Sequence, residues 1–183
     1  MTNFLLVRHG EPYYETPLIK PDAPLTDLGI QKSIITSKKM ELEGTEIVVS
    51  SPTKRTVQTA NIISEELGVP LVIEDGIKEW IPDLKTLYTT SDIQVKRFQM
   101  ALAEYIKGES FGNQPYEKLT DAKKRALDVL IKYLYFRKVV VVTHAGIMKV
   151  FSQRKYRYCG MLPINHDLET INDEFKKLYY KND

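Results

Sequence analysis

Short runs of apolar residues recur along the chain, and three of them end at polar residues that can take part in chemistry. The first run covers residues 4–7, and similar runs lie within 46–50, 70–74 and 139–143. Runs of this length, bounded by turn-forming or charged residues, are typical of strands buried on both faces of a parallel sheet. We therefore expect strands at these four places.

Apolar residues at helical spacing fill the segments between these runs. Threonines are the expected N-caps, and Gly44 and Gly68 are the expected ends of the first two helices. The predicted helices run from Thr26 to about Glu43, from Thr53 to Leu67, from Thr120 to about Tyr135, and from Ile147 onward.

Several of these helices should bury an apolar stripe. In the first helix the stripe is Leu28, Ile30, Ile34 and Ile35. In the helix from Thr120 it is Ala126, Leu127, Leu130, Ile131 and Leu134. The tail from Asp167 shows the same spacing and predicts an amphipathic terminal helix, with Leu168, Ile171, Phe175 and Leu178 on one face.

Strands that alternate with helices through short connections indicate right-handed crossovers and a parallel sheet. The predicted fold class is α/β: a three-layer sandwich with a mostly parallel central sheet flanked by helices, in one domain over residues 1–183. Glycines and prolines break this rhythm over residues 75–118. We interpret about 81–118 as a small cap insertion over one edge of the sheet, with one helix from about Ser91 to Lys107.

Composition removes several classes of function. A net charge of +2, without a dense block of lysine and arginine, argues against nucleic acid or a membrane as partner. One cysteine, Cys159, excludes an internal disulfide and a cysteine-cluster metal site. The histidines (His9, His144 and His166) lack the close spacing of zinc motifs, so neither a metal nor another cofactor is expected. Without a signal peptide or transmembrane run, the expected location is the cytoplasm. The oligomeric state is left open.

Three of the expected strands end in reactive side chains. Because the carboxyl ends of parallel strands emerge at the same edge of a sheet, these side chains should meet in one ligand crevice. Taken alone, Arg8 and His9 would more readily be a surface cation and a loop histidine, but the similar residues at two further strand ends favour a site. The three ends are Arg8-His9-Gly10, Ser50-Ser51-Pro52 followed by Arg55, and Thr143-His144-Ala145-Gly146.

Two arginines and two histidines in one crevice require an anion as counter-charge, and phosphate is the natural choice. Arg8 and Arg55 offer planar forks for phosphate oxygens, and the amides of Ala145 and Gly146 open a helix. A histidine that is neutral at pH 7 can attack phosphorus, and His9 is the best candidate for that nucleophile.

The leaving oxygen of a phosphate ester needs a proton, which a carboxylic acid with a raised pKa can donate. Glu79, beyond the third strand, is expected to reach the crevice, where Trp80 would help to desolvate it. Glu11 is the competing acid. An exposed loop carboxylate is the alternative interpretation of Glu79.

Four segments, taken in order, resemble the histidine phosphatase superfamily in its phosphoglycerate mutase-like branch. Each match is only suggestive, but the set is highly specific. Leu5–Glu11 resembles the leading signature of the family, Pro24–Gln31 its Leu-Thr-x-x-Gly-x-x-Gln segment, Ser50–Ala60 its second-arginine segment, and Val142–Gly146 its second-histidine segment.

The resemblance implies a phosphohistidine enzyme with His9 as the nucleophile and Glu79 as the proton donor. Arg8, Arg55 and His144 would complete the phosphate pocket. The other branch of the family carries an aspartate directly after the second histidine, where this chain has Ala145. The chain is therefore unlike the phytase and acid-phosphatase branch, and the assignment of Glu79 gains weight.

One position departs from the family pattern. Many members carry an asparagine that contacts phosphate where this chain has Glu15. A carboxylate there would repel phosphate, so either the loop turns Glu15 away or Glu15 reads a cationic part of the substrate. That phosphate contact is not carried over.

The leading hypothesis is a metal-independent phosphomonoester hydrolase that acts on a small phosphorylated metabolite. Glycolytic mutases that resemble this family are longer, with extra segments that retain a bisphosphate intermediate. The alternatives are a phosphoglycerate-type phosphomutase and a non-catalytic phosphate-binding regulatory module. The sequence does not name the physiological ester.

Overall fold

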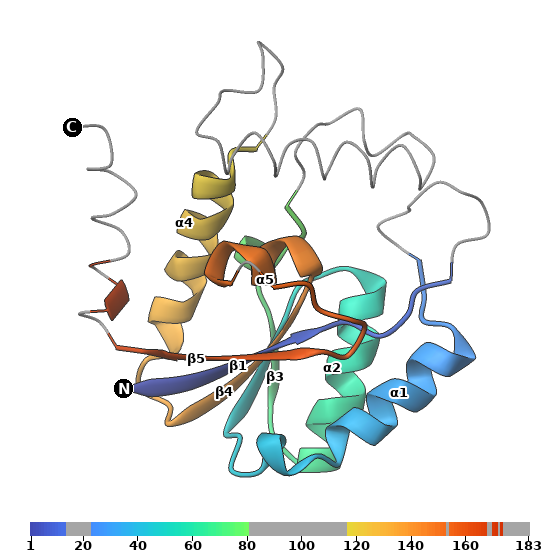
Figure 1. Cartoon of the computed structure of the whole chain (residues 1–183). Coiled ribbons are helices and arrows are strands. Elements are labelled where there is room, and N and C mark those ends of the chain that lie inside the picture. Colours follow the sequence, from blue (N-terminus) through green and yellow to red (C-terminus); the bar gives the residue numbers. More distant parts are fainter. Residues whose placement is uncertain (14–22, 81–116, 153, 168–169, 172, 174–183) are drawn as a thin grey trace.

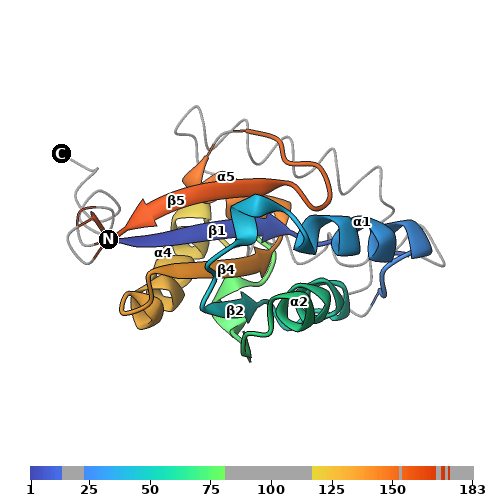
Figure 2. The same ribbon diagram turned by 90° about the horizontal axis from the view of Figure 1, so that it is seen from below.

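A computed structural model describes residues 1–13, 23–80, 117–152, 154–167, 170–171 and 173 of the chain. In this part, five strands form one sheet in the order β3-β2-β4-β1-β5. The strands are β1 (Thr2–Arg8), β2 (Ile47–Ser50), β3 (Leu71–Ile73), β4 (Lys138–Thr143) and β5 (Met161–His166). Four are parallel, and β5 runs antiparallel to β1 at one edge, as Figure 2 shows. The predicted α/β fold class with a mostly parallel central sheet is confirmed, and the single domain over residues 1–183 stays a prediction.

Helices cover both faces of this sheet (Figure 1). The α-helices are α1 (Asp27–Ser37), α2 (Lys54–Leu67), α4 (Leu119–Leu130) and α5 (Ala145–Phe151). Single 3-10 turns follow three elements: η1 (Met40–Leu42), η2 (Asp75–Ile77) and η4 (Ile131–Tyr133). α1 packs beside α2, and α4 packs beside α5. No helix in the described part of the chain is long and apolar enough to cross a membrane.

Alternate residues of the central strands supply two separate cores. Phe4 and Leu6 of β1 belong to one cluster with the buried side chains of α4 and α5. Leu5 and Val7 point to the other face, where they join a second cluster that includes Ile63 of α2. Since side chains alternate across a strand, burial on both sides explains why β1 is an unbroken apolar run.

The helix boundaries agree with the sequence in most places. The Thr26 hydroxyl accepts a hydrogen bond from the Gly29 amide and caps α1 as expected. Gly68 ends α2 in the left-handed conformation, with φ of 63°. The prediction of Thr120 as an N-cap was wrong, because α4 begins at Leu119 and the helical turn already includes the threonine.

The predicted buried face of α1 was also wrong. Leu28, Ile34 and Ile35 are 49%, 41% and 65% exposed, whereas the helix buries Gly29, Ser33, Thr36 and Ser37. The physical reason is a close approach: a side chain at position 29 would collide with the backbone of Glu11. Only small residues let α1 lie directly against the chain that leaves β1. The helix also ends at Ser37, earlier than predicted.

The antiparallel strand β5 was not expected from the sequence. It is an edge strand that pairs with β1, and such a position tolerates Pro163 in its middle. The predicted cap helix at about 91–107 lies outside the described residues, as does most of the predicted terminal helix from Asp167.

Two isoleucine variants test this assignment of inside and outside. Ile63→Ala should lower the free energy of unfolding by about 2–5 kcal/mol, since buried contacts are lost and a cavity remains. Ile35→Ala should change it by less than about 0.5 kcal/mol, because the side chain already faces solvent. Urea denaturation measures both. A loss of about 2 kcal/mol or more in Ile35→Ala would show that the apolar face of α1 is covered in solution.

Candidate active site

Three strand ends meet at one edge of the sheet, as the sequence predicts. β2, β4 and β1 are neighbours, and Ser51, His144 and His9 directly follow them. The rings of His9 and His144 lie 5.1 Å apart between centroids, with planes inclined by 65°. His144 and Ser51 are fully buried and His9 is 4% exposed, whereas Arg8 is only partly buried.

Arg55 lies between the two histidines. It is the second residue of α2 and only 5% exposed. Its Nε donates to His9 Nε2 at 3.3 Å, and its Nη2 lies 3.3 Å from His144 Nδ1. Burial, and next the Arg55 charge, hold the pKa of both histidines well below the ordinary value of 6.5. Both rings are therefore neutral at pH 7.

The hydrogen bonds fix the tautomer of His9. Its Nδ1 lies 2.7 Å from the carbonyl oxygen of Gly10, which can only accept, so Nδ1 carries the proton. The lone pair then resides on Nε2, the atom that faces Arg55. A neutral imidazole with a lone pair directed at a cation can bond to phosphorus held by that cation.

His144 has the opposite tautomer. A guanidinium cannot accept, so Nδ1 accepts from Arg55 and the proton is on Nε2. That N–H donates to the Ser51 hydroxyl at 2.9 Å. Ser51 therefore sets the ring orientation of His144. The sequence placed Ser51 at a strand end but gave no reason to assign it this contact.

Arg8 is the second guanidinium of the site. Its Nη1 donates to the carbonyl of Tyr156 at 2.7 Å, and its Cζ lies 4.1 Å from the ring centroid of Tyr158. Its Nε is buried without a hydrogen-bond partner among the described residues. A buried charged donor in this state fits a site that an anion completes.

A turn between α5 and β5 supports the end of β1. Cys159 has φ of 58°, and its amide donates to the carbonyl of Arg8 at 3.0 Å. The Arg8 amide in turn donates to the carbonyl of Gly160 at 2.9 Å. These bonds hold Arg8 and the start of the His9 loop. The sequence carries no signal for this contact, because β5 itself was not predicted.

Glu79 is held against the loop that contains His144. Its Oε1 accepts from the amides of Gly146 and Trp80, both at 2.9 Å. A side chain at position 146 would collide with this carboxyl, so Gly146 permits the approach. Burial raises the pKa of Glu79 above its usual range, while the charges of Arg55 and Arg8 oppose the shift. Glu79 is therefore not an exposed loop carboxylate, which was the alternative interpretation of this residue.

Of the two amides expected to open this helix beside the phosphate site, that of Gly146 donates to Glu79. The amide of Ala145 begins α5, and its contact with phosphate stays a prediction. Glu15 lies outside the described residues. The structure brings together the other predicted site residues: Arg8, His9, Arg55, Glu79 and His144.

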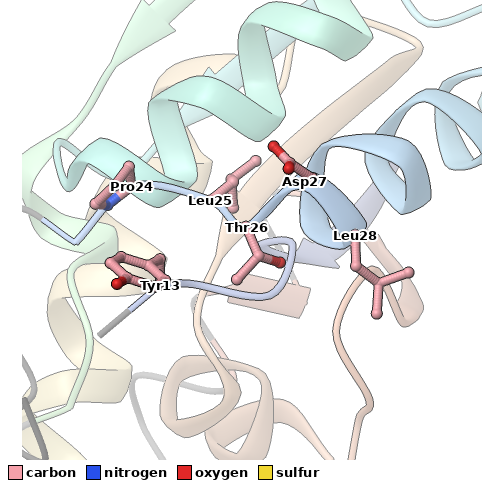
Figure 3. A pocket seen from close by; sticks show the side chains of 6 residues that line it. All are labelled: Tyr13, Pro24, Leu25, Thr26, Asp27 and Leu28. Carbon is pink, nitrogen blue, oxygen red and sulfur yellow. The ribbon is translucent and has the colours of Figure 1, made fainter. Parts of the chain in front are cut away.

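A separate hollow of about 410 Å³ lies at the start of α1, as Figure 3 shows. It is lined by Tyr13, Pro24, Leu25, Thr26, Asp27 and Leu28. None of the five clustered side chains belongs to its lining. Within the described residues, no group of three or more His, Cys, Asp or Glu side chains is placed to hold a metal ion.

Comparison with known proteins agrees with this architecture. Part of the chain is similar to the "Probable phosphoglycerate mutase GpmB" of Yersinia pestis (strain Pestoides F). The two are 32% identical over 82 residues, which cover 43% of this chain and 38% of that protein. The chain thus covers well under half the length of this curated relative.

Solved structures show a similar fold at low identity. A mycobacterial glucosyl-3-phosphoglycerate phosphatase, in complex with inorganic phosphate, has a TM-score of 0.72 at 18% identity, with 93% of each chain covered. A phosphoserine phosphatase from Entamoeba histolytica, in complex with 3-phosphoglyceric acid, has a TM-score of 0.67 at 19% identity, with 89% of this chain and 90% of that one covered.

The sequence model of the histidine phosphatase superfamily (branch 1) matches residues 4–158, a span that contains all five clustered side chains. This match agrees with the resemblance of the four sequence segments. It also agrees with the parallel sheet and its strand-end side chains. The chain belongs to the histidine phosphatase superfamily, branch 1.

Proposed function

We propose that this protein is a phosphomonoester hydrolase that works through a phosphohistidine intermediate and needs no metal ion. The observation that carries the proposal is the neutral Nε2 of His9, which faces the buried guanidinium of Arg55 at 3.3 Å. Two guanidiniums and a second imidazole surround it, and these can balance the charge on a transferring phosphoryl group.

In the first step, His9 Nε2 forms a bond to phosphorus as the bond from phosphorus to the leaving oxygen breaks. Glu79, whose raised pKa favours its acid form, gives its proton to that oxygen, and the alcohol departs. Arg8, Arg55 and His144 hold the equatorial phosphoryl oxygens during the transfer.

In the second step, water attacks the phosphohistidine. The Glu79 carboxylate takes a proton from this water, the new oxygen–phosphorus bond forms, and the bond to His9 Nε2 breaks. Inorganic phosphate leaves, and both His9 and Glu79 return to their starting protonation states.

We propose a small phosphate ester as the substrate and the cytoplasm as the location. The name of the curated relatives favours a phosphoglycerate mutase as the second candidate. A mutase would return the phosphoryl group from His9 to a second sugar-acid hydroxyl instead of water. The site residues are the same in both reactions, so the acceptor decides between them.

Replacement of His9 tests the nucleophile. The wild-type protein should hydrolyse p-nitrophenyl phosphate in the presence of EDTA, and His9→Ala should lower kcat by at least about 1,000-fold because the covalent route is lost. His166→Asn is the matched control: this histidine is also buried, but it lies at the far end of β5, and its loss should leave kcat unchanged.

Two results with other ligands would contradict the proposed hydrolase. Turnover of phosphoglycerate only when a bisphosphate is added, without release of phosphate, would indicate the mutase. Tight phosphate binding with no turnover of any ester would indicate a non-catalytic binding module.

The pH profile tests the proton donor. Because burial raises the pKa of Glu79, its acid form persists above the usual carboxyl range, and kcat/KM should fall as pH rises through that raised pKa. Glu79→Gln should remove this alkaline limb and lower the plateau by about 100-fold. Glu11→Gln should keep the limb. If the limb vanished in Glu11→Gln instead, Glu11 would be the acid.

A further inference from the structure

Residues 76–80, the segment that carries Glu79, are held in place by helix α4. After the single turn η2, residues 78–80 form no helix or strand of their own. α4 packs directly on this segment, and a side chain at Gly76 would approach the Arg125 carbonyl oxygen to 2.7 Å. The position of Glu79 therefore depends on α4.

Arg125 of α4 binds the segment through its backbone. Nη1 donates to the carbonyls of Gly76 and Lys78 at 2.7 and 2.8 Å, and Nη2 donates to the carbonyl of Glu79 at 3.3 Å. The remaining N–H groups bind the Glu117 carboxylate, with Nη2 at 2.9 Å and Nε closer. All five N–H donors of the guanidinium are thus matched to acceptors.

Glu117 binds both Arg125 and Trp80, the last residue of the segment. Its carboxylate binds Arg125 in bidentate fashion, and its backbone carbonyl accepts the indole N–H of Trp80 at 2.7 Å. The side chains of Arg125 and Glu117 are 25% and 24% exposed, so water screens the pair only in part. Residues 76–80 are held at both ends by these two residues.

The contacts of Arg125 are distinct from the charges that act on the Glu79 carboxyl. Arg55 and Arg8 are the cations that most lower the pKa of that carboxyl, and Lys149 also acts on it electrostatically. In the described contacts, Arg125 meets Glu79 at its backbone carbonyl. Loss of Arg125 should consequently move Glu79 while leaving the phosphate-binding cations in place.

We propose that Arg125 and Glu117 are positioning residues, which hold the Glu79 carboxyl at the depth where it protonates the leaving oxygen. This inference rests on the proposed hydrolase function and adds residues that the sequence analysis did not single out. A general acid displaced by about 1 Å can lose as much as 100-fold in rate, so the effect of the pair on kcat/KM should be large for an ester whose leaving oxygen needs the proton.

Leaving groups of different basicity separate positioning from stability. An alkoxide leaving group needs the proton of Glu79, whereas 2,4-dinitrophenolate leaves without it. Arg125→Met should lower kcat/KM for glycerol phosphate by about 30- to 100-fold and kcat/KM for 2,4-dinitrophenyl phosphate by less than about threefold. The ratio kcat/KM reports formation of the phosphohistidine alone, so the later hydrolysis, in which Glu79 serves both esters as a base, does not enter the comparison. Arg125→Lys, which keeps the charge but not the planar fork, should fall between Arg125→Met and wild type.

Lys132→Met supplies the matched control. Lys132, just after α4, forms a 2.8 Å ion pair with Glu74, just after β3, and so links nearly the same two regions as Arg125. In the described contacts, Lys132 touches none of residues 76–80. This variant should keep the wild-type ratio of the two rates. Fluorescence of Trp80, the single tryptophan, reports whether the segment has moved in each variant.

Each result decides between positioning and its alternatives. An equal fall for both esters in Arg125→Met, or no fall at all, would overturn the proposal. If Arg125→Met does not fold, Arg125→Lys and Glu117→Gln carry the same comparison, and a wild-type ratio of rates in both would overturn it. Absence of hydrolysis by the wild-type protein would instead contradict the proposed function.

Discussion

One buried guanidinium, that of Arg55, lies between two buried imidazoles, and the chemistry of the site depends on this contact. A cation at this place disfavours a proton on either ring, so His9 and His144 both direct lone pairs at the same group. Arg8 adds a second charge, with its Nε unsatisfied among the described residues. A tetrahedral oxyanion would accept hydrogen bonds from both arginines, and for Arg55 it would replace the histidine lone pairs as the acceptor.

The fold places these groups by aligning strand ends. β1 and β4 pair in parallel up to Arg8 and Thr143, and β2 pairs with β4 up to Ser50 and Val142, so each strand delivers its next residue to one edge. The helices then complete the site from both faces. α2 supplies Arg55, α1 supports the loop after β1 with its small residues, and α4 holds the Glu79 segment from beyond the sheet.

The sequence predicts those parts of the site that depend on strand order and residue type. Arg8, His9 and His144 lie at the ends of apolar runs, and Arg55 lies at a helix start. Parallel pairing of the strands, together with the start of α2, brings them together. The sequence does not predict contacts to backbone atoms. Arg125 binds carbonyls, which every residue carries. Ser51 is the same residue type as its neighbour Ser50 and differs in lying just beyond the end of β2, where it meets His144. The face of α1 was misassigned because close packing onto Glu11 outweighs the burial of three apolar side chains.

We infer that two arginines and two histidines form one anion pocket: Arg8, Arg55, His9 and His144. Calorimetric titration of inorganic phosphate into the protein at pH 7 tests it most directly. We predict one phosphate per chain, with affinity that falls as salt rises, and a loss of about 30-fold in Arg55→Met, which removes a charge-assisted hydrogen-bond donor set. Equal phosphate affinity in the wild-type protein and in Arg55→Met would contradict the account.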